Sequence, residues 1–446
     1  MVLLIIAWSG VAAQVSIPIP QSNIQSGVSY TSTQNSGSLT GTLIVGPTIK
    51  LSGSSPILLQ TSTGSSFPVT NLGIQLSTIG GINLISGSSP IQLSTTAQTI
   101  YSSVASVGGG VIALNYTIPA AGYAWVAGTY TTSLTYSLTS VLGGVVSPGL
   151  LTITIPAFIV APVSISTVTL NVNSLNYYSS QTVSASSSLA YSTTVPYNIS
   201  IAGNSANFTY SNTLGLSTPS NLAISNVLSN VGSGANVNLS STAKSLTASP
   251  ISVSNGNNQT QTLNFSITPA SLLSQFVQTG TYTVPITLTT SDARSSPTVA
   301  NQTTTSTLTV NVADMLSFAV NDATTTMTLS TATNYQNGVN QSQSNHLTVS
   351  STSPWSIKVQ AASGNLANGS NTIPVSYVSI GNTSGQSLLT TTTLSASAQT
   401  ITSGQAPAIN QAVGVNYSIS AANAQLLISK PSGTYSTALT YTLSAL

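Results

Sequence analysis

The chain has 446 residues but only 5 Lys and Arg, 3 acidic residues and 1 His, so charged residues make up 2% of it, where a soluble domain carries roughly 25%. Acid–base catalysis and ordinary metal binding depend on carboxylates, His, Cys and Lys. With no Cys and almost no charge, the composition argues against an enzyme and predicts no catalytic site, no metal site and no cofactor. The few basic residues are scattered and predict no nucleic-acid partner.

Residues 1–13 form a short apolar run followed by small residues. Val11 and Ala13 stand where a signal peptidase would cut before Gln14. We therefore expect a signal peptide and a secreted, extracellular protein. The alternative is a buried N-terminal strand, which the β-branched Ile5 and Ile6 would suit. No run of ~20 apolar residues follows, so we expect no membrane span.

The next segment, QVSIPIPQ, places Val15, Ile17 and Ile19 on one face of an expected strand. Its two prolines remove backbone donors from the same edge, so the segment can pair well along one side only. We predict that these three residues form a subunit interface by adding to the sheet edge of a neighbouring copy. The alternative is that the segment is the first edge strand of its own chain.

One module of ordinary domain size occurs three times in the sequence. An Asn-aromatic-Ser/Thr-Ile core leads each time into a Gly-Thr-Tyr triplet, which starts at Gly128, Gly280 and Gly433, about 152 residues apart. An upstream block also recurs, at Leu93, Leu239 and Leu394. The second and third modules also match in their first halves, whereas the first module has diverged there. Repetition of this kind predicts three domains.

After each Gly-Thr-Tyr triplet, apolar residues alternate with Ser and Thr, as in 128–138. This period of two is typical of half-buried strands, here with Ser and Thr on the outer face. The best candidates for short helices are around 269–276 and 421–428. We therefore predict an all-β protein of tandem antiparallel immunoglobulin-like β-sandwiches. The domains would span 14–160, 161–313 and 314–446, and the short stiff links between them would give a rod.

Residues that could carry chemistry are few and isolated. His346 lies in an expected strand without an acidic or Cys neighbour in sequence, and we expect it to be a surface residue. Asp314 and Asp322 flank the second domain junction, but a Ca²⁺ site requires more oxygen ligands than these two provide. We expect Asp292 and Arg294 to form a local exposed ion pair of little energetic value.

Three aromatic residues could in principle stack on sugars. Trp355 and Tyr197 each follow a Pro at the start of a strand, and Trp125 lies in the first module. Equivalent placement in two modules favours a core role.

About eleven Asn-x-Ser/Thr sequons occur, which the abundance of Ser and Thr explains by chance. Asn115, Asn264 and Asn416, however, lie at the same point of all three modules and are candidates for covalent glycans. O-linked glycans on the Ser/Thr faces are equally compatible with the sequence.

The modular plan, the Ser/Thr-faced strands and the alternating N-terminal segment resemble subunits of microbial surface filaments assembled by strand exchange, including archaeal threads and bacterial fimbriae. The resemblance implies a homopolymer in which a terminal strand joins each copy to the next. We therefore predict a structural filament subunit of the cell surface, and near-zero charge would favour such self-association. The alternatives are a glycan- or surface-binding adhesin and a two-dimensional surface-layer protein.

Overall fold

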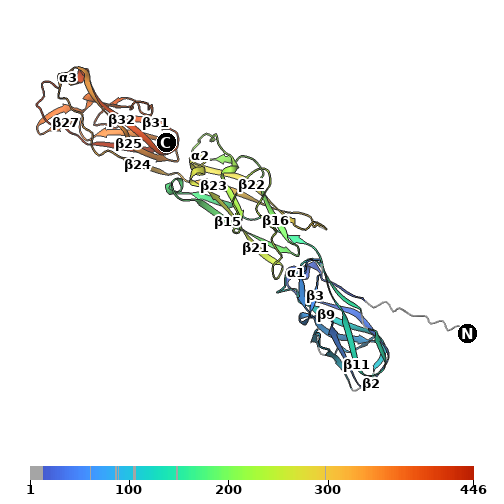
Figure 1. Ribbon diagram of the computed structural model, residues 1–446. Coiled ribbons are helices and arrows are strands. Elements are labelled where there is room, and N and C mark those ends of the chain that lie inside the picture. The colour runs from blue at the N-terminus through green and yellow to red at the C-terminus, as the bar shows by residue number, and fades with distance from the viewer. Residues whose placement is uncertain are drawn as a thin grey trace.

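The computed structural model describes residues 14–60, 62–85, 88, 90–103, 107–146, 149–296 and 298–446. The predicted signal peptide, 1–13, lies outside them. Figure 1 shows three β-rich bodies in a row, which we call domains 1, 2 and 3. Each has its own hydrophobic core. The all-β fold built from packed antiparallel sheets, predicted from the sequence, is confirmed, while the immunoglobulin-like detail stays a prediction.

Domain 1 packs the sheet β1-β12-β10-β3-β4 against the sheet β11-β2-β9-β5-β6. Its elements are β1 (Gln14–Pro18), α1 (Gln21–Ser26), β2 (Tyr30–Gly53), β3 (Ile57–Leu59), β4 (Ser66–Pro68), η1 (Val69–Asn71), β5 (Gly73–Ile79), β6 (Ile82–Asn83), β7 (Ile91–Gln92), β8 (Gln98–Ser102), β9 (Val107–Ile118), β10 (Gly128–Thr132), β11 (Leu134–Val146) and β12 (Leu150–Ile155).

Domain 2 packs the sheet β13-β15-β21-β18-β19 against the sheet β14-β23-β22-β16-β20. Its elements are β13 (Ile159–Val160), β14 (Val168–Val172), η3 (Leu175–Tyr178), β15 (Val183–Thr193), β16 (Tyr197–Gly203), β17 (Thr209–Ser211), η4 (Ile224–Asn226), β18 (Leu228–Val231), β19 (Val237–Asn238), β20 (Lys244–Ser245), β21 (Asn258–Ile267), α2 (Pro269–Gln275), β22 (Gly280–Asp292) and β23 (Gln302–Val312).

Domain 3 packs the sheet β24-β25-β32-β29-β30 against the smaller sheet β31-β26-β33. Its elements are β24 (Leu316–Val320), α3 (Ala332–Asn337), β25 (Gly338–Ser351), β26 (Trp355–Ala361), β27 (Asn365–Asn368), β28 (Asn371–Pro374), η5 (Val375–Tyr377), β29 (Val378–Gly381), β30 (Thr392–Thr393), β31 (Gln399–Gln405), β32 (Ala408–Ser420), α4 (Ala421–Gln425) and β33 (Leu439–Ala445). The two predicted short helices are confirmed as α2 and α4.

The glycine of each Gly-Thr-Tyr triplet has a backbone conformation that other residues rarely adopt. Its φ angle is 139° at Gly128, 137° at Gly280 and 151° at Gly433. A Cβ at these positions would also collide with the side chain of Gln60, Tyr210 or Asn368, respectively. Both constraints favour glycine at this point of every module.

Domain 1 differs from the others because its long strand β2 replaces two strands. One backbone hydrogen bond recurs in all three domains and shows which strands are equivalent. An N–H group at the end of the strand donates to the carbonyl of a Ser in the recurring upstream block, and the pairs are Gly53 with Ser94, Gly203 with Ser240, and Ala361 with Ser395. The last part of β2 therefore corresponds to β16 and β26. The divergence of the first module seen in the sequence is a change of connection rather than a loss of these strands.

The two domain junctions share one Thr-centred set of hydrogen bonds. At the first, Thr194 accepts the Ala127 N–H at its carbonyl (2.7 Å) and the Phe158 N–H at its hydroxyl (3.0 Å). At the second, Thr352 accepts the Thr279 N–H (2.7 Å) and the Met315 N–H (2.7 Å) in the same way. Bonds of this kind fix neighbouring domains relative to each other.

Asn257 adds a second tie at the first junction. It is fully buried, has a φ of 61° and donates from Nδ2 to the carbonyls of Trp125 in domain 1 (2.7 Å) and Thr193 in domain 2 (2.7 Å). Its Oδ1 accepts the Trp125 N–H at 3.1 Å. A single amide thus completes the backbone bonding of both domains.

Candidate functional site: an open sheet edge in domain 3

In domains 1 and 2, the last strand lies between two others. β12 pairs antiparallel with β10 and parallel with β1, and β23 pairs antiparallel with β22 and parallel with β14. Each last strand contributes three aliphatic residues to the core at alternate positions. These are Leu151, Ile153 and Ile155 in β12, and Leu308, Val310 and Val312 in β23.

In domain 3, the described residues place no strand at this position. β33, the counterpart of β22, pairs with β26 along one side and has no strand along the other. Residues 326–331, which align by sequence with β14, form no strand either. The first part of the third Gly-Thr-Tyr run, 433–438, is likewise outside any strand, although β22 begins at the equivalent Gly280. One edge of β33 is therefore open.

Side chains along this edge have the same pattern as their counterparts but are less covered. Tyr282, Val284, Ile286 and Leu288 of β22 are all 0% exposed. The corresponding run in domain 3 contributes Tyr435, Leu439, Tyr441 and Leu443, and all four are half-buried. Apolar side chains that point inward yet remain partly in water indicate a missing neighbour.

β24, the edge strand of the other sheet of domain 3, also has partly exposed apolar side chains. Leu316 and Val320 of β24 are 43% and 47% exposed, and Phe318 between them is half-buried. Met327 and Leu329, in the segment that aligns with β14, are half-buried too. We call these five residues, together with Tyr435, Leu439, Tyr441 and Leu443, the acceptor edge.

Four polar side chains form a hydrogen-bonded row beside the acceptor edge. His346 is 3% exposed, and its Nε2 lies 2.9 Å from the Tyr417 hydroxyl, which lies 2.6 Å from that of Tyr441. Its Nδ1 lies 3.3 Å from a carboxylate oxygen of Asp322. Burial raises the pKa of both tyrosines, so both hydroxyls stay protonated at neutral pH. The expectation that His346 is a surface residue is wrong, because the side chain is buried. The sequence did not reveal this, since its acidic neighbour Asp322 is 24 residues away in the chain.

Val15, Ile17 and Ile19 lie in the core of their own domain 1 and are at most 2% exposed. They are on or directly after β1, which pairs parallel with β12. The Ile19 N–H donates to the Thr154 carbonyl at 3.0 Å. Pro18 and Pro20, which lack such donors, therefore face the free edge of the sheet. The segment is therefore the first edge strand of its own chain, which was the alternative given in the sequence analysis. A role of Val15, Ile17 and Ile19 in a subunit contact stays a prediction.

The three candidate glycosylation residues occupy central strands. Asn115 is on β9, Asn264 on β21 and Asn416 on β32, and all are half-exposed. Asn115 and Asn416 accept hydrogen bonds from Thr33 and Ser342 at their Oδ1 atoms. Among the described residues, their Nδ2 atoms have no hydrogen-bond partner, whereas that of Asn264 donates to Asn230 and Gly232. The first and third amides are therefore the better placed for modification.

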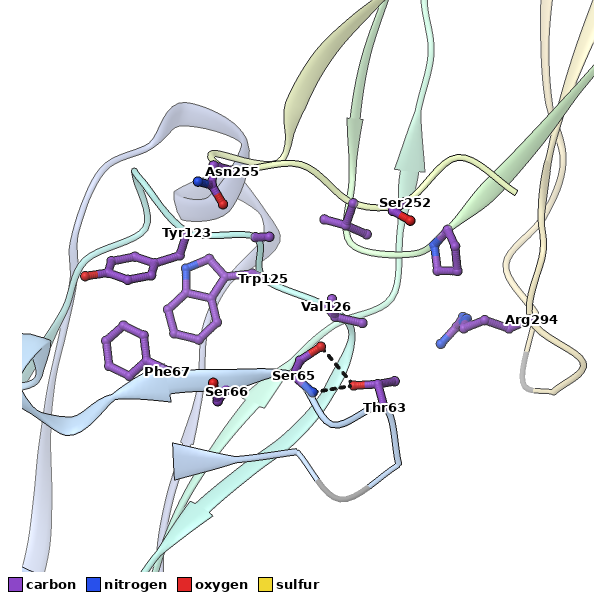
Figure 2. A pocket seen from close by; sticks show the side chains of 13 residues that line it. Thr63, Ser65, Ser66, Phe67, Tyr123, Trp125, Val126, Ser252, Asn255 and Arg294 are labelled. Carbon is purple, nitrogen blue, oxygen red and sulfur yellow. Dashed lines mark hydrogen bonds between the residues drawn. The ribbon is translucent and has the colours of Figure 1, made fainter. Parts of the chain in front are cut away.

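A cavity of ≈ 530 Å³ lies at the junction of domains 1 and 2 (Figure 2). Tyr123, Trp125, Phe67 and Arg294 are among its lining residues. Trp125, however, is 1% exposed and stacks on Phe67 at a centroid distance of 4.7 Å, so its face is unavailable to a sugar. Trp355 is also 1% exposed. Both tryptophans are core residues.

The few carboxylates have structural partners. The Asp292 side chain is 1% exposed and accepts Arg294 Nη2 at 2.6 Å, while the Arg294 side chain is 20% exposed, so the expectation of an exposed pair is wrong. Burial raises the pKa of Asp292, but hydrogen bonds from Arg294 and the Val299 N–H outweigh it and hold the pKa below its usual value. Asp314 accepts the Ser353 hydroxyl at 2.6 Å. Among the described residues, no three His, Asp or Glu side chains gather in a metal-binding group.

Comparisons with known proteins found likenesses in structure alone. No protein-family model matches the chain, and no curated protein does. CfaE, the adhesive subunit of the CFA/I fimbria of enterotoxigenic Escherichia coli, is 12% identical, with 68% of this chain and 98% of that chain covered and a TM-score of 0.30.

Two further solved structures are similar at the same level. The CupB6 tip adhesin from Pseudomonas aeruginosa is 11% identical, with 64% of this chain and 91% of that chain covered and a TM-score of 0.26. The CooA pilin subunit from enterotoxigenic Escherichia coli is 17% identical, with 35% of this chain and 99% of that chain covered and a TM-score of 0.21.

Within the described part of the chain, no helix has the length and apolarity to cross a membrane.

Proposed function

We propose that the protein is a non-enzymatic structural subunit of an extracellular surface filament, and that copies join by β-strand addition at the acceptor edge. The observation that carries this proposal is the contrast between β22, whose four inward side chains are fully covered, and the corresponding run in domain 3, whose side chains are half-buried. A strand from a second copy would complete domain 3 in the way that β23 completes domain 2.

Strand addition would cover the acceptor edge of domain 3. Burial of three aliphatic side chains there contributes roughly 1.5–3 kcal/mol each, which offsets the equal burial that Val15, Ile17 and Ile19 lose in domain 1. Further burial of Tyr435, Leu439, Tyr441 and Leu443, and main-chain hydrogen bonds along the edge of β33, offset the β1–β12 contacts that are given up. Because the chain carries a net charge of only +2, electrostatic repulsion between copies is small.

The strand supplied would be the N-terminal segment that contains Val15, Ile17 and Ile19. Its sequence Val-Ser-Ile-Pro-Ile-Pro has the same apolar spacing, and the same final proline, as Leu-Thr-Ile-Thr-Ile-Pro at 151–156, which ends β12. In the added position its donor-bearing edge would face β33. The proline-bearing edge would face 326–331, which lies outside any strand and needs no regular ladder.

This exchange requires β1 to leave domain 1. β1 is an edge strand with five residue pairs to β12, and β12 keeps its antiparallel partner β10 when β1 departs. The burial of Val15, Ile17 and Ile19 lost in domain 1 is regained in domain 3 of the neighbour, as in a domain swap. The exchange therefore replaces the contacts of β1 in domain 1 by contacts with the acceptor edge of the neighbour.

Disulfide trapping tests the arrangement without interference, because the chain has no Cys. If the added strand takes the register of β23 on β22, in which Thr283 pairs with Thr309, Ser16 lies opposite Ser436 of the neighbour. Antiparallel partners have Cα atoms close enough for a disulfide. Polymers assembled from equal amounts of S16C and S436C chains should therefore yield a mixed disulfide dimer on mild oxidation.

The matched control is a mixture of S16C with S342C, since Ser342 is exposed on β25 in the other sheet. It should give no mixed dimer. Polymers that form without the Ser16–Ser436 crosslink would reject this N-terminal segment as the added strand. Electron microscopy that finds monomers alone in the native protein would overturn the filament proposal itself.

Covalent glycans belong to the same proposal, as part of a hydrated, uncharged outer surface. Asn115 and Asn416 are the first positions to examine, because within the described part of the chain only their Oδ1 atoms take part in side-chain hydrogen bonds.

A further inference from the structure

The first and last strands of domains 1 and 2 run side by side in the same direction. In domain 2, β14 pairs parallel with β23 over five residues, from Val168 opposite Leu308 to Val172 opposite Val312. In domain 1, β1 pairs parallel with β12 over five residues. Parallel pairing of terminal strands means that the chain enters and leaves each domain toward opposite ends.

This geometry determines how a pull along the chain acts on domain 2. Tension draws β14 back toward domain 1 and draws β23 forward toward domain 3, so the two strands are pulled past each other lengthwise. All hydrogen bonds between them then bear the load at once. If the strands were instead pulled apart from one end, the bonds would break one after another under a much smaller force.

The links between domains are short and hydrogen-bonded, so they transmit tension directly from one domain to the next. Three residues, 156–158, separate β12 from β13, and another three, 313–315, separate β23 from β24. The Thr194 hydroxyl donates to the Pro156 carbonyl at 2.7 Å, and the Thr352 hydroxyl donates to that of Ala313 at 2.8 Å. Each link is thus fixed to the following domain at the point where the chain leaves the preceding one.

We propose that domain 2 is a tension-bearing module in which the parallel pair β14–β23 holds the load along the rod, and that β1–β12 does the same in domain 1 of a chain whose β1 is in place. The proposal goes beyond filament formation, and for domain 2 it applies to a single chain as much as to a polymer. Domain 3 behaves differently when the chain is pulled through Leu446. β33 ends beside domain 2, where the Leu446 N–H donates to the Pro354 carbonyl, and it would peel from β26.

Pulling the same domain from different points tests the proposal and leaves the fold unchanged. The full-length T167C/N311C variant places optical-trap handles at the start of β14 and the end of β23, which loads the pair lengthwise. The N173C/N311C variant places both handles at the same end, which peels the pair apart. All three positions are exposed, and the chain contains no Cys of its own.

Lengthwise loading should need at least about twice the force of peeling at the same loading rate, since forced unfolding depends on the barrier along the pulled direction. The melting temperatures of both variants should match that of the unmodified chain, which shows that direction and not stability sets the difference. Equal rupture forces in the two geometries would overturn the proposal. Rupture of the T167C/N311C variant at forces typical of unzipping would do so as well.

Discussion

A copy of residues 292–312 placed after Ser444 is expected to abolish polymer formation and to raise the melting temperature of domain 3. The copy contains the turn and the strand that complete domain 2, so it would fold back along β33 as β23 does along β22. Leu308, Val310 and Val312 of the copy would cover the acceptor edge, with roughly 1.5–3 kcal/mol from each buried side chain. Size-exclusion chromatography and calorimetry measure both effects.

A second fusion provides the control. In it, the copied Leu308, Val310 and Val312 are replaced by Ser, which keeps the length and the turn but removes the apolar side chains. This fusion should polymerise like the unmodified chain. Polymers that persist unchanged with the apolar copy would show that the acceptor edge is not where subunits join.

Substitution N257G is expected to loosen the first domain junction and to cost about 2–4 kcal/mol of stability. Glycine tolerates the φ of 61° at this position, so the change removes the amide without adding backbone strain. It leaves two carbonyls and one N–H without their buried partner, and each such loss costs about 1–3 kcal/mol before water compensates. Chemical denaturation measures the stability, and small-angle X-ray scattering the broader range of shapes.

N410G is the matched control. Asn410 also has a positive φ, 53°, but its amide accepts one hydroxyl, from Ser350 within domain 3. Its replacement should change stability little and the shape not at all. If N257G kept the scattering profile and stability of the unmodified chain, the role assigned to the Asn257 amide would be refuted.

The fold could be predicted from sequence because alternation and repetition are strong local signals. The alternation after each Gly-Thr-Tyr triplet predicts a strand with one apolar face, and Tyr282, Val284, Ile286 and Leu288 of the second run are all fully buried. The short helices α2 and α4 could be placed because their residues interrupt this alternation at equivalent points of the repeat.

The acceptor edge was harder to predict because it depends on what lies beside a strand. Leu439 and Leu443 have the same pattern as their buried counterparts, and nothing within their own run distinguishes a paired strand from an unpaired one. The runs that complete the first two Gly-Thr-Tyr strands, at 150–155 and 302–312, alternate in the same way as those strands themselves. The burial of His346 depended on contacts with Asp322 and Tyr417, which local sequence does not report.

The Thr-centred junctions have a consequence for bending stiffness. Thr194, Thr352 and Asn257 are neutral, and the bonds they make are short and mostly shielded from water. Dissolved salt weakens contacts between exposed charges and leaves such bonds almost untouched. The persistence length of the rod should therefore be the same in fresh water, brine and dilute acid.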